Sequence, residues 1–239
     1  MREARIASQS LDLDESCDPA IVDEAARTLE RGGLVLLRTV VGYGIVGTSD
    51  DAIAAMYELK GRPLTNPLIV VGNIDLFDAL TKPVEKTARD WLDRIVTRTT
   101  LAVVNDIDTE SSLFRNMSDV AKSQATRDGS VAIFLNTGWL PEQLAKRMAE
   151  KGRVLFGTSA NATGQGNSQC FEEVPDAIRR AADFSFDQGE VFYRTLDKLA
   201  TTIVDLRTMT ISRIGVSAAM LMQDLRKLHV QMSHSANTN

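Results

Sequence analysis

The chain has 239 residues, of which 44 % are hydrophobic and 25 % are charged, and its 27 basic and 32 acidic residues give a formal net charge of −5. This length and apolar content are typical of a water-soluble globular protein with a substantial core. The acidic balance excludes a protein that coats nucleic acid through a uniformly basic surface, although it is compatible with a local basic groove.

The number of cysteines and the length of the apolar runs indicate the cellular compartment of the protein. Cys17 and Cys170 are the two cysteines, too few for a disulfide or metal framework, which favours a reducing compartment. The amino terminus leads into no apolar run, and no apolar segment approaches the ~20 residues that span a bilayer. We therefore expect a soluble, cytoplasmic protein with no signal peptide and no membrane partner.

Helix and strand patterns begin after a polar segment, residues 1–16, that we expect to be flexible. Asp18 followed by Pro19 is typical of a helix start and predicts a helix over 19–31. The glycine pair that follows ends this helix, and the apolar run 34–37 predicts a buried strand.

Three glycines, Gly42, Gly44 and Gly47, then predict a flexible turn. They match the G-x-G-x-x-G pattern of dinucleotide-binding turns. That match alone is weak. Dinucleotide-binding turns are followed about 20 residues later by an acidic residue at the end of a strand, whereas this region holds Lys60 and Arg62.

The rest of the chain continues the alternation of helices and strands. Further helices are predicted at 74–80, 83–96, 141–151, 174–182 and 218–229, and further strands at 68–71, 100–104, 130–135, 153–156, 190–193, 201–206 and 210–214. Residues 105–128 read as a long polar excursion, partly helical around 111–125, of the kind that forms lids or partner surfaces. We therefore expect one α/β domain over 17–216, with a twisted mixed sheet flanked by helices, and a C-terminal helix with a disordered tail over 217–239.

The connection between a helix and the strand at 68–71 carries the first candidate site. Lys60, Arg62 and Asn66 lie beside Pro63 and Pro67, which stop the helix and stiffen the backbone. A point charge and a planar guanidinium two residues apart suit an oxyanion such as a phosphate. The alternative is a solvated basic turn.

The second candidate site follows the predicted strand at 153–156. Gly157 and Gly164 allow close backbone approach, while Ser159 and Asn161 supply a hydroxyl and an amide. Such a loop can hold a phosphate or a ribose, and the alternative is an ordinary polar turn.

A third, weaker candidate lies near the end of the domain, where Thr201 and Thr202 begin a predicted strand and Arg213 precedes a glycine. Threonine is also simply a good strand residue. The two histidines, His229 and His234, are near the C-terminus, and there is no GxxxxGK[ST] motif. We therefore expect cations and hydroxyls to stabilise a nucleotide, with Mg²⁺ carried by its phosphates.

Together these segments resemble the YrdC-like family, the threonylcarbamoyl-adenylate synthases of tRNA modification. The family pattern K-x-R-P-x-x-N-P-L matches Lys60–Leu68, S-x-N matches Ser159–Asn161, S-T-x-V-D matches Thr201–Asp205, and the late R-x-G matches Arg213–Gly215. The resemblance extends over residues 18–216, and the order and spacing of four motifs make it specific.

The resemblance implies an enzyme that uses ATP, bicarbonate and L-threonine to form threonylcarbamoyl-AMP and pyrophosphate. Lys60 and Arg62 would be catalytic, and the implied ATP-binding residues are Lys60, Arg62, Asn66, Ser159, Asn161 and Arg213. The implied substrate-binding residues are Thr39, Tyr43, Phe134 and Thr201.

Departures from the family pattern gather on the amino-acid side. Arg38–Val41 replaces P-T-E-T, Val96–Thr100 replaces P-G-P-x-T, Val71 replaces a histidine, and Phe134 replaces the arginine expected to meet the threonine carboxylate. Each lost charge-assisted hydrogen bond is worth roughly 1.5–3 kcal/mol, and a carboxylate placed there would be unpaired. The sequence therefore predicts a retained nucleotide site and an acceptor less polar than threonine, or none.

Three functions stay open at this point. The first is an enzyme that forms a carbamoyl-adenylate. The second is a module that binds double-stranded RNA or tRNA without catalysis, and the third is a carbamoylating enzyme of specialised metabolism. RNA binding would weaken steeply with salt, whereas turnover of ATP would release pyrophosphate.

Overall fold

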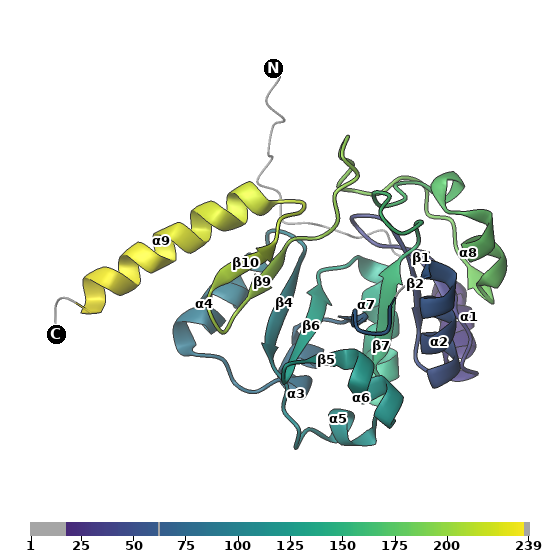
Figure 1. Cartoon of the computed structure of the whole chain (residues 1–239), viewed down its shortest axis with the longest axis horizontal. Coiled ribbons are helices and arrows are strands. Elements are labelled where there is room, and N and C mark those ends of the chain that lie inside the picture. The colour runs from purple at the N-terminus through teal and green to yellow at the C-terminus, as the bar shows by residue number, and fades with distance from the viewer. Residues whose placement is uncertain (1–17, 62, 237–239) are drawn as a thin grey trace.

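The computed structural model describes residues 18–61 and 63–236, and Figure 1 shows a central sheet with helices on both sides. Two predictions, the flexible segment 1–16 and the role of Arg62, lie outside the described residues. Within the described part of the chain, no helix is both long enough and apolar enough to cross a membrane.

The strands form one mixed sheet. Their order is β10–β9–β4–β6–β3–β7–β2–β1–β8, with β5 added beside β6. The pairs β1/β8, β3/β6 and β4/β9 are parallel, and the other pairs are antiparallel. The strands are β1 (Val35–Arg38), β2 (Tyr43–Gly47), β3 (Ile69–Val71), β4 (Leu101–Asp106), β5 (Thr126–Arg127), β6 (Ser130–Leu135), β7 (Leu155–Ser159), β8 (Phe184–Ser185), β9 (Ile203–Asp205) and β10 (Thr210–Arg213). The predicted α/β domain with a mixed sheet is confirmed.

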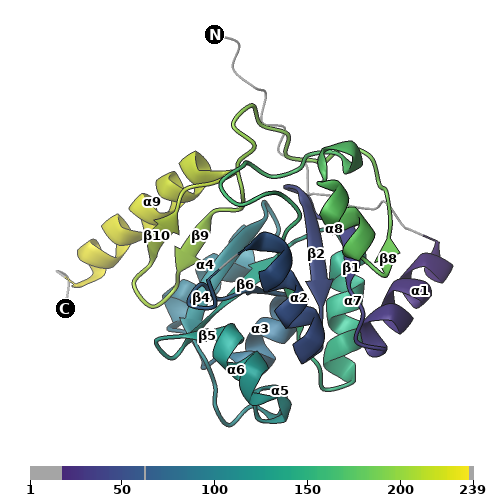
Figure 2. The ribbon, with the colours of Figure 1, turned by 45° about the vertical axis from the view of Figure 1, so that its right-hand side comes forward.

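Helices cover both faces of the sheet. They are α1 (Pro19–Glu30), α2 (Asp50–Lys60), α3 (Ile74–Leu80), α4 (Lys86–Ile95), α5 (Ser112–Asn116), α6 (Asp119–Ala125), α7 (Trp139–Glu150), α8 (Asp176–Ala181) and α9 (Ala218–Ala236), with a 3₁₀ turn, η1 (Phe171–Glu173). In both views α9 lies at the opposite end of the molecule from α1, beside β10 (Figure 1 and Figure 2).

The core divides according to the pleat of the strands, because successive side chains on a strand point to opposite faces. Val46 and Val71 pack in the apolar cluster under α1 and α7. Their chain neighbours Ile45 and Val70 pack in the larger cluster under α2, α3 and α4. Leu221 of α9 also belongs to this larger cluster, which attaches the C-terminal helix to the domain.

The predicted start of the first helix is confirmed. Asp18 is the N-cap of α1, its side chain accepts a hydrogen bond of 2.9 Å from the backbone N–H of Ala20, and Pro19 occupies the first helical position. The side-chain oxygen satisfies a backbone donor that the helix itself leaves unpaired.

The predicted flexible turn at Gly42–Gly47 is wrong, because residues 43–47 form the fully buried strand β2 between β1 and β7. Here glycine permits close packing. A Cβ on Gly47 would lie 2.5 Å from the Cβ of Ala52 on α2. The G-x-G-x-x-G match therefore does not form a nucleotide-binding loop.

Three further expectations need correction. β7 continues through Ser159, so the second candidate motif begins inside a strand. Residues 190–193 form no strand; single backbone hydrogen bonds of Val191 and Tyr193, to Gln169 and Val40, hold this segment instead. The C-terminal helix α9 extends to Ala236, beyond its predicted end at residue 229.

The excursion predicted at 105–128 is shorter and better packed than expected. β4 extends to Asp106, α5 and α6 follow, and β5 leads back into β6. Leu113, Ala121 and Ala125 are buried in the larger core cluster. These apolar anchors, spaced among polar residues, hold the segment against the domain.

Gly47→Ala should destabilise the fold by roughly 1–3 kcal/mol, since the added methyl group forces β2 and α2 apart. Gly44→Ala on the same strand is the matched control, because its Cβ would meet its nearest neighbour, the carbonyl oxygen of Thr158, at 3.4 Å. We expect the control to change stability by less than about 1 kcal/mol. Urea unfolding of both variants measures this, and equal losses would contradict the packing argument.

Candidate functional site

A cavity of about 320 Å³ lies on the sheet face that α1 and α7 cover elsewhere. Its floor includes Val46 of β2, Val71 of β3 and Phe134 of β6, from three strands of the sheet. Gly157 of β7 keeps this floor open, since a Cβ there would lie 3.0 Å from Val71 and 3.1 Å from Val46. The volume is that of a small-molecule site.

Lys60 joins the first two candidate motifs directly. Its Nζ donates to the backbone oxygens of Ser159 at 2.8 Å and Asn161 at 2.5 Å, and to Oδ1 of Asn161 at 2.7 Å. The hydroxyl of Thr163 donates back to the Lys60 carbonyl at 2.6 Å. The lysine and the Ser-x-Asn bend therefore form a single wall, of which Ser159 lines the cavity while Lys60 does not.

The local sequence explains why Lys60 reaches this wall. It is the last residue of α2, and Gly61 caps the helix in the left-handed conformation, with φ 52°. Glycine adopts this conformation without steric cost. The helix thus stops at Lys60, whose side chain extends to the end of β7.

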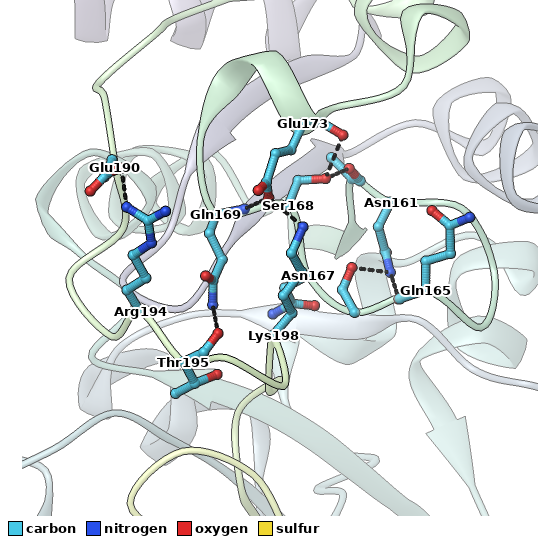
Figure 3. Close-up of polar contacts among 12 residues, drawn as sticks. Asn161, Gln165, Asn167, Ser168, Gln169, Glu173, Glu190, Arg194, Thr195 and Lys198 are labelled. Atoms are coloured by element: carbon cyan, nitrogen blue, oxygen red, sulfur yellow. Dashed lines mark hydrogen bonds and ion pairs between the residues drawn. The ribbon is translucent and has the colours of Figure 1, made fainter.

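The bend after β7 is itself tightly hydrogen-bonded. The Ser159 hydroxyl donates to Oδ1 of Asn161 at 2.5 Å, and Nδ2 of Asn161 donates to the carbonyls of Gln165 and, at 3.2 Å, Gly166. Figure 3 shows the Asn161 amide turned toward Gln165. Ser159 lines the cavity, whereas Asn161 supports the bend from outside the cavity lining.

Asn66 and Arg213 also line the cavity, and they come from segments far apart in the sequence. The Asn66 carbonyl accepts from the Tyr57 hydroxyl at 2.7 Å. The Arg213 guanidinium donates to the Thr201 carbonyl through Nε at 3.1 Å and Nη2 at 2.9 Å. The fold therefore brings Asn66, Ser159 and Arg213 to one cavity.

The other end of the cavity is apolar. Phe134 is 6 % exposed and packs with Val40, Val41 and Val216. Val71 lies beside Phe134 in the parallel register of β3 and β6. The two apolar replacements noted in the sequence are thus neighbours in space.

The remaining predicted substrate residues, Thr39, Tyr43 and Thr201, line the cavity too. The Thr39 hydroxyl donates to the Gly42 carbonyl at 2.7 Å, which fixes the turn between β1 and β2. The Tyr43 hydroxyl serves a structural contact: it donates within 2.9 Å to Asp187 and Gly189 and accepts from the N–H of Gln188 at 3.1 Å. Burial raises the pKa of Tyr43.

Two loops on one side of the cavity are joined by polar contacts (Figure 3). The Glu173 carboxylate accepts from the backbone N–H of Gln169 at 2.8 Å and forms a 3.0 Å ion pair with Lys198. These partners lower the pKa of Glu173, with the N–H of Gln169 the larger cause. Nε2 of Gln169 donates to the Thr195 carbonyl at 3.0 Å, which ties the segment after β7 to the segment before β9.

Sequence reasoning missed two polar residues of the cavity, Arg127 and Asn167. The dipeptide Asp128-Gly129 is a hairpin signal that could have located Arg127 at a strand end. Asn167 donates to the Val41 carbonyl at 3.1 Å, a contact across 126 positions that has no local signature.

Comparison with known proteins follows from this geometry. The family model of Sua5/YciO/YrdC proteins, described as "Telomere recombination", matches residues 27–215. The chain belongs to this family. The resemblance found in the sequence is therefore confirmed.

A curated relative of this Sua5/YciO/YrdC chain is the threonylcarbamoyl-AMP synthase of Bacillus subtilis (strain 168), 37 % identical over 79 residues. That match covers 32 % of the chain and 23 % of the relative, less than a quarter of the latter's length. This match supports the family assignment, and the activity of the relative is a proposal for this chain.

Solved structures share the fold. Protein smu.1377c from Streptococcus mutans UA159, described as hypothetical, has a TM-score of 0.74 at 18 % identity, covering 89 % of this chain and 93 % of that one. P. abyssi Sua5, complexed with L-threonine, has a TM-score of 0.65 at 21 % identity, covering 84 % and 56 %. E. coli YciO has a TM-score of 0.62 at 15 % identity, covering 84 % and 92 %.

Tyr43→Phe should cost roughly 1–3 kcal/mol of stability, because the buried Tyr43 side chain loses its hydrogen bonds with Asp187, Gln188 and Gly189. Tyr193→Phe is the matched control, since its hydroxyl lies 3.3 Å from that of Thr99; we expect a smaller loss. Urea unfolding at pH 7 measures both.

The pH dependence gives a second readout of the same residue. Because the pKa of Tyr43 is raised, the unfolded chain alone releases this proton as the pH rises above about 10. The stability that Tyr43 contributes is therefore complete below that pH and declines above it. A difference between the wild type and Tyr43→Phe that grows above pH 10 would contradict this assignment.

Proposed function

We propose that the protein binds ATP and forms a carbamoyl-adenylate from bicarbonate and an amino acid less polar than threonine, as a divergent member of the tRNA threonylcarbamoyladenosine chemistry. The observation that carries the proposal is the division of one cavity. Ser159, tied to Lys60, and Arg213 bring polar and cationic groups to it, whereas Val71 and Phe134 form its apolar end.

The polar groups fit a polyphosphate. The contacts of Lys60 with Ser159 and Asn161 are to uncharged oxygens, which orient the ammonium without neutralising it. The Arg213 guanidinium carries a charge in all ordinary conditions and offers donors in a planar fork. Among the described residues, no three His, Cys, Asp or Glu side chains gather to hold a metal ion, so Mg²⁺ would enter with the phosphates.

The reaction divides between the two ends of the cavity. Bicarbonate and the amine of the amino acid condense to a carbamate with loss of water. A carbamate oxygen then bonds to the α-phosphorus of ATP, the bond from that phosphorus to the bridging oxygen breaks, and pyrophosphate leaves. Lys60 and Arg213 would offset the negative charge on the phosphates, which is the main task of a protein in such transfers.

The apolar end sets the choice of acceptor. Phe134 and Val71 offer no hydrogen bond to a side-chain hydroxyl, and placing one against them leaves it unpaired. The family resemblance favours this end for the amino acid, and the packing of Phe134 with Val40, Val41 and Val216 makes the surface around it apolar. An aliphatic side chain therefore fits better than that of threonine.

Lys60→Ala should weaken ATP binding at least about tenfold, since it removes a charge and the tie that holds Ser159 and Asn161. Lys86→Ala is the matched control, because this lysine is 84 % exposed and pairs with Asp90 on α4. Isothermal titration calorimetry of ATP against both variants gives the comparison. Equal affinities would show that the Lys60 wall binds no phosphate.

Pyrophosphate release from ATP, bicarbonate and a panel of amino acids tests the acceptor. L-valine and L-threonine have the same shape and differ by one hydroxyl, so they form a matched pair. We expect L-valine to support at least as much release as L-threonine. Release that depends selectively on L-threonine would contradict the altered acceptor, while salt-sensitive binding of RNA without any release would favour the binding-module alternative.

A further inference from the structure

A second hollow of about 400 Å³ adjoins the cavity. It lies between the loop after α2, which contributes Thr65 and Pro67, and the α6–β5 segment, which contributes Ser123 and Arg127. Pro67 and Arg127 line both spaces. A ligand that fills the cavity therefore meets Arg127 where it would continue into the second hollow.

Arg127 is held in place by a tight hairpin. Asp128 and Gly129 have φ of 51° and 73°, so both central residues are left-handed, as in a type I′ turn. Arg127 pairs with Ser130, whose hydroxyl donates to the Arg127 carbonyl at 2.8 Å. The fixed backbone sets the direction in which the long side chain leaves the strand.

The register places Arg127 over the cavity floor. Ser130, Ala132 and Phe134 are alternate residues of β6 and share one face of the sheet. Arg127 lies opposite Ser130, so it stands on the same face at the far end from Phe134. Four residues of strand separate these ends by roughly 13 Å, which puts Arg127 beyond a small amino acid bound near Phe134.

The charge around this position favours an anion. The side chain of Arg127 is 71 % exposed, and its contact with Asp128 is long, 3.9 Å from Nε to Oδ2. Such an exposed pair contributes little and yields readily to a ligand. Among the described residues that line the two hollows there are two arginines, Arg127 and Arg213, and no Asp or Glu, although the chain has 32 acidic residues.

We propose that Arg127 binds the terminal phosphates of the nucleoside triphosphate, and hence pyrophosphate, at the junction with the second hollow. The inference rests on the proposed function and adds a residue and a subsite to it. Thr65 and Ser123, which carry hydroxyls, line the same hollow as Arg127. The nearby Asn66–Pro67 segment leads from the same loop into the cavity, which puts the subsite on the nucleotide side.

Calorimetry with inorganic pyrophosphate and with AMP, on the full-length chain, tests the assignment. Arg127→Gln should weaken pyrophosphate binding about tenfold or more and change AMP binding less than about twofold, because AMP lacks the terminal phosphates. Arg127→Lys should retain part of the affinity. The matched control is Arg115→Gln, an arginine of α5 that is 62 % exposed and pairs with Glu110 at 3.3 Å.

Each outcome bears on a separate statement. Equal pyrophosphate affinities for Arg127→Gln and Arg115→Gln would overturn the subsite, and ATP binding by the wild type would then leave the proposed function intact. Equal losses of AMP and pyrophosphate binding would overturn the assignment to the terminal phosphates. A wild-type protein that binds neither ATP nor pyrophosphate contradicts the subsite and the proposed function together.

Discussion

The contact between the Lys60 ammonium and the bend after β7 determines the geometry of the whole site. An ammonium has three donors, and here they meet the Ser159 carbonyl and two oxygens of Asn161. This arrangement fixes the end of α2 against the end of β7, two elements that approach from different layers of the fold. These three acceptors are uncharged oxygens, so they orient the ammonium without cancelling its positive charge.

The second constraint is the apolar closure of the cavity at Phe134. A charged group at this point would face Val40, Val41 and Val216, where an unpaired carboxylate is costly, so the proposed aliphatic amino acid would turn its side chain toward Phe134 and its carboxylate toward the polar lining. The same sheet face thus carries Arg127 and Ser159 toward one end of the strands and hydrocarbon at Phe134 toward the other, with Arg213 on the edge strand β10. Because β6 extends along the floor from Phe134 to the residue paired with Arg127, a single strand connects the region proposed for the acceptor with the region proposed for the terminal phosphates.

Local sequence signals predicted most elements of the fold, because helix caps and apolar runs act over a few residues. Asp18 as an N-cap is one example. The glycines of β2 give a turn signal although they lie in a strand, since Gly47 serves close contact with Ala52, which local sequence does not reveal. Family motifs identified Asn66, Ser159 and Arg213 as site residues, and all three line one cavity. The sequence does not predict Arg127 as a site residue, because its position over the cavity floor depends on the pairing of β5 with β6.

In the proposed site, phosphates bind against the wall made by Lys60 and the bend at Ser159. A crystal structure with a non-hydrolysable ATP analogue tests it most directly. We expect phosphate oxygens within hydrogen-bonding distance of Ser159 and Arg213, with the region beside Phe134 left for the acceptor. An analogue whose phosphates lie beside Phe134, or outside the cavity, would contradict it.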